Sequence, residues 1–314
     1  MLKLNYRTLF LIFPLVLPIC ISSCSTFDPP EMVPAYGHID SIHFTMPADS
    51  VALMGSPSAN IPYAWVYLDD NPVGAFQMPC TFPMIAANGS HNIKIYPGVT
   101  PVGINSPAAI YPFYQFYSFN INLQQGSTYK FHPTSLYYTW AKFPFLENFE
   151  SGGEIAGQPS IRIINYHGGG SATGASTTSM YVIQNPNLVY GRSGNSGMVV
   201  VNQSTPYYCG VTFFGKDSLP NSNTPVYIEL NYRCTADFSI GLFESNIGGD
   251  TASQASPTAI IYPASKWTKM YVCLNTTLQQ FSSTSYNHQL YFTMQWQQGD
   301  PNDTLLLDNI KILY

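Results

Sequence analysis

Hydrophobic and polar residues alternate along most of the chain, in short stretches that end at Gly, Pro, Asn or Ser. No extended segment repeats its apolar residues with the 3.6-residue period of an amphipathic helix. Alternation with a period of two is typical of half-buried strands, so the pattern predicts an all-β chain. In the stretch 118–123, apolar residues at odd positions alternate with Ser and Asn at even positions, which indicates a sheet with one face toward solvent.

The predicted strands form two groups, and we expect two antiparallel β-sandwich domains at residues 35–143 and 144–314. Asp70-Asn71-Pro72 is expected to form a turn in the first domain. In the second domain, the alternation at 290–296 directs Leu290 and Trp296 inward. The other strands expected from alternation cover residues 38–45, 64–69, 73–78, 92–96, 116–123, 128–132 and 226–234.

The first 24 residues have the layout of a bacterial secretory signal that ends at a lipid-modified cysteine. Lys3 and Arg7 precede an apolar run at 9–19, which is shorter than the roughly 20 residues that a membrane span needs. Ile21-Ser22-Ser23-Cys24 supplies an aliphatic residue and two small residues before the cysteine. We therefore expect cleavage after residue 23, acyl chains such as palmitate on Cys24, and an extended tether at 24–34 outside the cytoplasm.

The low charge of the chain limits the classes of partner that we expect it to bind. Charged residues make up 9% of the sequence, against about 25% in ordinary soluble proteins. Loss of residues 1–23 removes two basic side chains from 12 and none of the 17 acids, which leaves 10 against 17. Phosphate binding needs a basic surface, so nucleic acid is disfavoured as a partner. A neutral surface of Tyr, Asn, Ser and Thr is common in extracellular β proteins.

Cys24 is one of five cysteines that remain after the expected cleavage. An oxidising envelope permits disulfides, but four thiols allow three full pairings and the sequence does not choose among them. Alternation places Cys234 on the apolar side of its strand, which suits a buried thiol equally well. No His/Cys spacing suggests zinc. The remaining cysteines are Cys80, Cys209, Cys234 and Cys273.

The stretch 64–74 resembles the hairpin of PEGA-type envelope domains. In those domains a small residue precedes Val-Tyr-Val-Asp-Gly; here Ala64 precedes Val66-Tyr67-Leu68-Asp69, and Asp70 replaces the usual Gly. The Thr-Pro that normally follows is displaced to Met78-Pro79. The resemblance covers part of the first domain and implies a small β-sandwich that spaces or docks and has no chemistry of its own.

The second domain begins with Phe-Leu-Glu-Asn-Phe-Glu at 145–150 and closes with an aliphatic-Asp-Asn-Ile strand at 304–312. With the turn and strand at 191–201, these segments resemble the jelly-roll sandwiches of carbohydrate-binding modules. The resemblance implies a glycan ligand, and a structural calcium ion shared by Glu150 and Asp308 where the chain ends meet. Calcium takes six to eight oxygen ligands, so backbone carbonyls would complete the shell. Alternatively, Asp308 caps a strand end and Glu150 is solvated.

Taken whole, the architecture resembles surface or periplasmic lipoproteins of the Bacteroidota. Ser25 is not the Asp that retains lipoproteins at the inner membrane, which favours anchoring to the outer membrane, on its periplasmic or cell-surface side. Asp followed by Ser or Thr and then an aliphatic residue, Thr or Met also resembles the O-glycosylation acceptor of that phylum. The acceptors would be Ser41, Ser50, Ser218, Thr251 and Thr304.

Sugar rings present C–H faces that stack on aromatic side chains, while amides bind their hydroxyl groups. Most aromatics of a sandwich lie in its core, however, so each candidate has a structural alternative. The aromatic run 111–117 is an exposed interaction surface or the seal between the two domains. The candidate ligand-binding residues are Trp267, Tyr207, Tyr208, Tyr286 and Tyr291, with Gln295 and Gln297 on the outward side of their strand.

These observations favour a lipid-anchored, non-catalytic envelope protein whose second domain binds a glycan. The first alternative is a structural or assembly lipoprotein that docks onto another envelope protein. The second is a glycan-active enzyme in which Glu147 and Glu150 form the carboxylate pair. That pair lies at the expected domain junction, and the whole chain contains six Glu residues, so the enzyme is the least favoured alternative.

Overall fold

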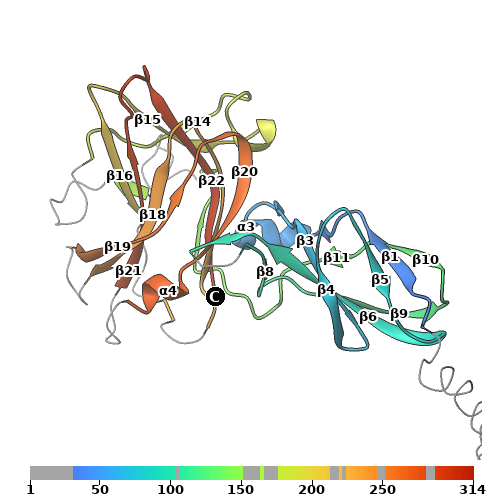
Figure 1. The fold of residues 1–314 in the computed structure, drawn as a ribbon. Helices are drawn as coiled ribbons and strands as arrows, with labels where there is room; N and C mark the ends of the chain where they lie inside the picture. Colours follow the sequence, from blue (N-terminus) through green and yellow to red (C-terminus); the bar gives the residue numbers. More distant parts are fainter. Residues whose placement is uncertain are drawn as a thin grey trace, which may run out of the picture.

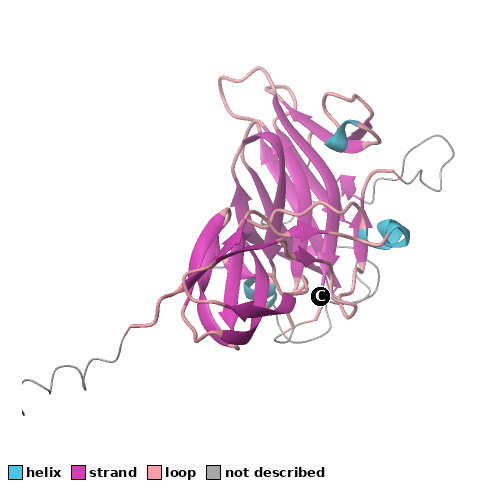
Figure 2. Ribbon diagram, turned by 90° about the vertical axis from the view of Figure 1, so that its right-hand side faces the viewer, coloured by secondary structure: helices cyan, strands magenta, loops and turns pink. Residues whose placement is uncertain are grey.

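The computed structural model describes residues 31–103, 107–150, 163–165, 176–212, 219–220, 224–245, 252–280 and 287–314. Strands dominate these ranges, and helical segments are one turn long (Figure 2). The all-β prediction is therefore confirmed. Within the described ranges, no helix combines the length and the apolar character needed to cross a membrane. The short helical segments are η1 (Ala48–Ser50), α3 (Val51–Met54), η2 (Tyr190–Arg192) and α4 (Asn275–Leu278).

The first half of the chain is a small sandwich around a core that includes Val66, Ile93 and Phe82. One layer contains β4 (Asn71–Gln77), β3 (Tyr63–Leu68), β6 (Gly89–Val99), β8 (Ala109–Ile110) and β9 (Tyr117–Leu123). The other contains β10 (Thr128–Phe131), β1 (Ala35–Ile39) and β5 (Cys80–Met84), beside the pair β2 (His43–Phe44) and β11 (Thr134–Ser135). The β1–β10 and β2–β11 pairs are parallel, so this half is not wholly antiparallel as expected.

The β3–β4 turn lies one residue earlier than the sequence predicts. Asp69 and Asp70 both have positive φ, at 50° and 64°, as a tight hairpin turn requires. Asn71 and Pro72 already belong to β4, and Pro72 is tolerated there because β4 is an edge strand of its sheet. Trp65 is half-buried on the opposite face of β3 from Val66.

The second half is a larger sandwich of two sheets. The central sheet follows the order β14 (Tyr181–Ile183), β15 (Ser196–Val201), β22 (Asp303–Leu313), β17 (Tyr227–Cys234), β20 (Ala264–Cys273) and β7 (Pro101–Val102), with β12 (Phe145–Glu147) also paired to β22. The distal sheet follows the order β13 (Ile163–Asn165), β16 (Tyr207–Thr212), β21 (Asn287–Gln295), β18 (Phe238–Ser245) and β19 (Ala252–Ile261). The chain crosses between the two sheets repeatedly, as in a jelly roll.

The core between these sheets matches the predicted alternation. Leu290, Phe292 and Met294 of β21 are buried in it, and Trp296 packs against it half-buried. Cys234 is buried in the same core, and none of the four described cysteines forms a disulfide.

The central sheet is covered on both faces, because the first half packs against its outer side (Figure 1). Tyr111, Phe113 and Tyr114 of the first half form one buried cluster with Tyr227 and Tyr271 of the central sheet. The aromatic run 111–117 therefore contributes a seal between the halves. Strand β7, from the first half of the sequence, also pairs with β20, so the chain segments interlock across the expected boundary at 143/144.

Candidate functional site

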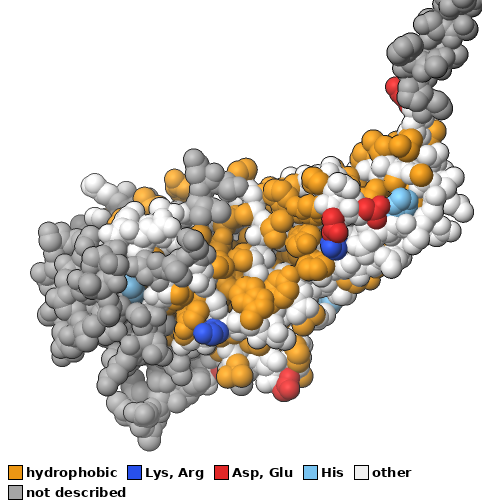
Figure 3. All heavy atoms as spheres, turned by 90° about the horizontal axis from the view of Figure 1, so that it is seen from below, with side chains coloured by type: hydrophobic (Ala, Val, Ile, Leu, Met, Phe, Trp, Pro, Cys, Tyr) orange, Lys and Arg blue, Asp and Glu red, His pale blue; other side chains and the backbone are white. Residues whose placement is uncertain are grey.

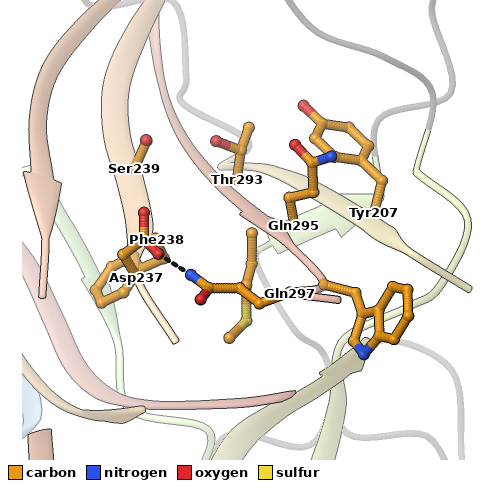
Figure 4. A pocket seen from close by; sticks show the side chains of 9 residues that line it. Tyr207, Asp237, Phe238, Ser239, Thr293, Gln295 and Gln297 are labelled. Carbon is orange, nitrogen blue, oxygen red and sulfur yellow. Dashed lines mark hydrogen bonds between the residues drawn. The ribbon is translucent and has the colours of Figure 1, made fainter. Parts of the chain in front are cut away.

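The outer face of the distal sheet carries a shallow hollow, which we call the distal-face concavity. Its volume is about 280 Å³. Tyr207 begins β16, Thr293 and Gln295 lie on β21, and Ser239 lies on β18; these side chains project to the same side (Figure 4). The lining residues are Tyr207, Asp237, Phe238, Ser239, Thr293, Met294, Gln295, Trp296 and Gln297.

Strand register explains why these side chains meet. In the β16–β21 pair Tyr207 lies opposite Gln295, and in the β18–β21 pair Ser239 lies opposite Thr293. Directly opposed residues of an antiparallel pair point to the same face. The register therefore sets one aromatic ring beside an amide and two hydroxyls without help from a loop.

Hydrogen bonds hold the lower end of the concavity. The side-chain amide of Gln297 donates to the carboxylate of Asp237 (Figure 4), and its backbone N–H donates to Asp303 Oδ2 at 2.9 Å. Trp296 Nε1 donates to the carbonyl of Asp300 at 2.8 Å. These contacts fix the orientation of the polar groups, and such preorganisation is a general way of lowering the entropic cost of binding.

The side chains that line this concavity are able to stack on a ligand ring and to form hydrogen bonds with it. An aromatic ring, two amides and two hydroxyls can contact the C–H face and the hydroxyls of a polar ring. Among the described residues that line it, Asp237 is the one carboxylate. Glycoside hydrolysis by the usual mechanism needs two carboxyls flanking the scissile bond, and this lining offers one.

The predicted ligand-binding residues divide into three groups. Tyr207, Gln295 and Gln297 are brought together in the distal-face concavity. Tyr208 and Tyr291 were expected at the surface, and this is wrong: they are 0% and 3% exposed. Tyr208 faces the core because it follows the outward Tyr207, whereas Tyr291 is on the outer face but buried in a cluster with neighbouring apolar residues.

Trp267 lies in a different hollow, between the two halves of the molecule. Tyr286 lies outside the described residues. Sequence reasoning missed Asp237, Ser239 and Thr293. The alternating pattern of its strand already indicated that Thr293 points outward. Nothing in the sequence, however, indicates that β18 pairs with β21.

The acidic residues expected to bind calcium lie near one another, and Glu147 joins them. Burial raises the pKa of Asp308 to about 7, and the charges of Glu150 and Glu147 add to this. Asp308 Oδ2 accepts a hydrogen bond from Ser196 Oγ at 2.6 Å, and Asp308 Oδ1 accepts one from the Asn309 N–H at 2.6 Å. Asp308 therefore lies buried within β22, which corrects the alternative that it caps a strand end.

The remaining oxygens of this acidic group are also partly occupied. Glu150 is exposed, and its Oε1 accepts from the Asn195 N–H at 2.6 Å. Glu147 is 2% exposed and accepts from the Phe149 N–H at 2.7 Å, so it does not face a cleft as a catalytic partner of Glu150. Within the described part of the chain, no three His, Cys, Asp or Glu residues are arranged to hold a metal ion. The calcium site stays a prediction.

The predicted acceptors for O-glycosylation lie in different settings. Ser41 is exposed in the connection between β1 and β2, and Ser50 is half-buried at the end of η1. Thr304 is half-buried within β22, opposite Val200. Cys24, Ser218 and Thr251 lie outside the described residues. Ser41 has the setting that best accommodates a bulky sugar.

A buried ionic cluster at the junction of the halves was not anticipated from the sequence. Glu229 Oε2 lies 2.7 Å from Lys269 Nζ and 3.8 Å from Lys311 Nζ. The hydroxyls of Tyr111 and Tyr137 each donate to the Glu229 carboxylate at 2.8 Å. Burial alone would raise the pKa of Glu229, but the charges of both lysines hold it below its usual value. Burial and the charge of Lys269 lower the pKa of Lys311 to about 7.

No protein-family model and no curated protein matches the chain. Solved structures show distant likeness. A family 11 carbohydrate-binding module from Clostridium thermocellum, in complex with a mixed-linked tetrasaccharide, is 14% identical over 55% of this chain and 94% of its own, with a TM-score of 0.37. The K2 cleaved adhesin domain of Lys-gingipain is 12% identical over 56% and 98%, with a TM-score of 0.35.

A xylan-binding CBM22-2 domain from Paenibacillus barcinonensis is 13% identical over 54% of this chain and 97% of its own, with a TM-score of 0.33. At these TM-scores the likeness carries no argument about the ligand of this protein. The sandwich architecture rests on the strand pairings themselves.

Proposed function

We propose that the distal-face concavity binds a glycan and that the protein is non-catalytic. The observation that carries the proposal is the side-by-side placement of Tyr207 and Gln295 by the β16–β21 register. A sugar ring stacked on Tyr207 leaves its hydroxyls within reach of the flanking amides and hydroxyls. In ligand sites a small number of placed polar groups fixes the orientation of the ligand, and Ser239, Thr293 and Gln295 supply such groups here.

A glycan array with the full chain in detergent tests this proposal. We expect wild-type protein to bind at least one polysaccharide, and Tyr207→Ala to lose about tenfold in affinity, equivalent to about 1.4 kcal/mol. Tyr181→Ala is the control, because Tyr181 is a strand tyrosine that lies on the central sheet, outside the distal-face concavity. Absence of binding to every glycan, or equal binding by Tyr207→Ala, would overturn the proposal.

We further propose that acyl chains on Cys24 anchor the protein to the outer membrane of a Bacteroidota-type envelope. The support is the signal-like start of the sequence and the Ile-Ser-Ser-Cys pattern. Cys24→Ala is expected to move the protein from the membrane fraction to the soluble fraction. Mass spectrometry of native material should find the lipid on Cys24; an unmodified N-terminus at Met1 would contradict the anchor.

Docking onto another envelope protein is the second candidate, and exposed apolar side chains favour it. Figure 3 shows hydrophobic side chains gathered over the middle of one face, with few charges among them. At the connection from β19 to β20, Ile260 and Tyr262 are also largely exposed. If this tip docks, a Tyr262→Ser change should abolish a specific crosslink in intact envelopes and leave glycan binding unaltered.

A further inference from the structure

The distal-face concavity carries a carboxylate that no cation of the described structure balances. The described residues that line the concavity include Asp237 but neither lysine nor arginine. Among the residues that the structure describes, no salt bridge includes Asp237. The charge of Asp237 therefore acts on whatever enters the concavity.

Strand register places Asp237 in the same row as the aromatic ring of the concavity. Asp237 directly precedes β18, in which Phe238 lies opposite Met294 of β21. One step further along this register, Asp237 comes opposite Gln295, which in turn lies opposite Tyr207 of β16. Residues opposed in this way point to the same face of the sheet. Two strand spacings, or about 10 Å, separate the backbones of Tyr207 and Asp237, so a ligand that contacts both side chains is longer than one sugar ring.

One oxygen of the Asp237 carboxylate is used within the protein, and the other is not. Oδ1 accepts a hydrogen bond from the side-chain amide of Gln297 at the surface. Figure 4 shows the second oxygen turned away from that amide, on the side of Ser239. In the part of the chain that the structure describes, this carboxylate makes no other hydrogen bond. Asp237 is half-buried rather than enclosed, so its second oxygen is accessible from the concavity.

A carboxylate in this position discriminates between ligands by their charge. A ligand ammonium can form a charge-assisted hydrogen bond with it, which is about twice as strong as a neutral one. A ligand carboxylate at the same place meets a like charge, and such contacts suppress binding of the wrong partner. Behind Gln297, the buried carboxylate of Asp303 accepts the backbone N–H at 2.9 Å, so a second acid rather than a base backs this end of the concavity.

We infer that the distal-face concavity selects oligosaccharides that carry free amino groups, and that Asp237 makes this selection. The inference rests on the proposed glycan-binding function and adds the class of glycan. One ring of the ligand stacks on Tyr207, and the ammonium of a neighbouring unit donates to the second oxygen of Asp237. The same carboxylate disfavours oligosaccharides of hexuronate units.

Calorimetric titration of the full chain in detergent tests the inference with three β-1,4-linked trimers, of glucosamine, glucose and glucuronate. The three probes share ring and linkage and differ in charge; at about pH 6 the amines are protonated and the carboxyls ionised. The glucosamine trimer is expected to bind about fivefold more tightly than the glucose trimer, as an exposed ion pair allows. The glucuronate trimer is expected to bind about fivefold more weakly than the glucose trimer.

Asp237→Asn removes the charge and keeps an oxygen that can accept from Gln297. This variant should bind the glucosamine trimer about fivefold more weakly than wild type and the glucuronate trimer more tightly. Asp40→Asn is the matched control, because Asp40 is an exposed acid between β1 and β2. It removes the same charge from the chain, so an effect of net charge alone would appear equally in both variants.

Equal affinity for the three trimers, a preference for the glucuronate trimer, no binding of any trimer, or an unchanged preference in Asp237→Asn would each overturn the inference. The comparison of trimers uses wild-type protein, so it decides the matter even if Asp237→Asn does not fold. The proposed function fails on a different result, which is absence of binding across the glycan array or equal binding by Tyr207→Ala. Array binding that depends on Tyr207, together with equal affinity for the three trimers, would leave the glycan site in place and remove only the role of Asp237.

Discussion

Glu229 and Asp308 are buried carboxyls on neighbouring strands of the same sheet, yet burial leads them to opposite states. Glu229 has two lysines and two tyrosine hydroxyls around it, and its pKa is lowered. Asp308 has hydrogen-bond donors but acidic neighbours, and its pKa is raised to about 7. Burial costs both acids their hydration; what differs is the charge that replaces it.

The two acids also differ in which half of the molecule supplies their hydrogen-bond donors. Tyr111 and Tyr137, which donate to Glu229, belong to the first half, so the ionised Glu229 depends on the docking of that half. Asp308 receives its hydrogen bonds from within the second half. The comparison teaches that the charges around a buried acid decide its state: the lysines at the junction keep Glu229 ionised, whereas the acidic neighbours of Asp308 favour its protonated form.

The largest effect is expected from removal of Glu229. Glu229→Ala leaves two buried ammonium groups without their carboxylate, and breaking a buried pair in this way costs about 3–5 kcal/mol. Urea denaturation measures the loss. Glu31→Ala, at an exposed site, should change stability by less than about 0.5 kcal/mol. Similar losses of stability in both variants would show that Glu229 contributes no more to stability than an exposed acid does.

Asp308 should make stability fall as pH rises. Its folded pKa, about 7, exceeds the ordinary value of 3.8, so its contribution is complete below about pH 4 and is lost as pH rises through 7. The difference between these two pKa values corresponds to about 2–4 kcal/mol in the free energy of unfolding. Asp308→Asn should flatten this part of the pH profile of thermal unfolding. An unchanged profile would contradict the raised pKa.

Bound calcium would favour the ionised form of Asp308 over its protonated form. If Glu150 and Asp308 share the ion, calcium at one hundred times its Kd should stabilise the protein by about 2.7 kcal/mol at alkaline pH. Thermal melts with calcium, magnesium and a chelator measure this. Asp308→Asn should abolish the gain. A melting temperature insensitive to calcium would remove the predicted site.

Single hydroxyls at the junction should have intermediate effects. Tyr137→Phe removes the hydrogen bond to Glu229 and leaves the ring in place, at a cost of about 1–3 kcal/mol. Denaturation of Tyr137→Phe and of Tyr181→Phe, an exposed control, gives the comparison. If the two variants were equally stable, the network around Glu229 would depend on its lysines alone.

A surface acid should show the smallest effect. Asp69 Oδ2 lies 2.6 Å from His91 Nδ1; this hydrogen bond raises the pKa of His91 and lowers that of Asp69. The His91 contribution is complete below about pH 6.5 and is lost as pH rises through its folded pKa. Because the pair is solvated, His91→Gln should cost under about 1 kcal/mol. NMR titration of the imidazole would reveal an unshifted pKa if the pair does not form in solution.

Sequence alternation predicted the direction of many side chains but not what covers them. The parity of 290–296 placed Leu290 and Phe292 in the core and Gln295 outward, as the structure has them. Tyr291 also points outward by parity, yet it is buried. The odd or even position of a residue in a strand tells which face of the sheet its side chain is on. Whether that side chain is exposed depends on long-range packing, which the local pattern does not contain.

For the same reason, the sequence alone did not predict the buried ionic cluster around Glu229 at the junction of the halves. Lys311 lies between Ile310 and Ile312, which is the pattern of a strand with one solvated face. In the structure its ammonium is enclosed by the carbonyl of Met54 at 2.5 Å and the Tyr137 hydroxyl at 3.2 Å. Both partners come from the first half, more than 170 residues away, and no spacing in the sequence relates them to Lys311.

The place of β22 constrains how the protein is built. This strand sits between β15 and β17 and also pairs with β12, and the ribosome makes it after all three. Until it arrives, its future neighbours expose unpaired backbone groups, which are templates for association between chains. Nascent molecules therefore pass through an aggregation-prone interval before β22 is available, and holding chaperones would raise the yield of folded protein.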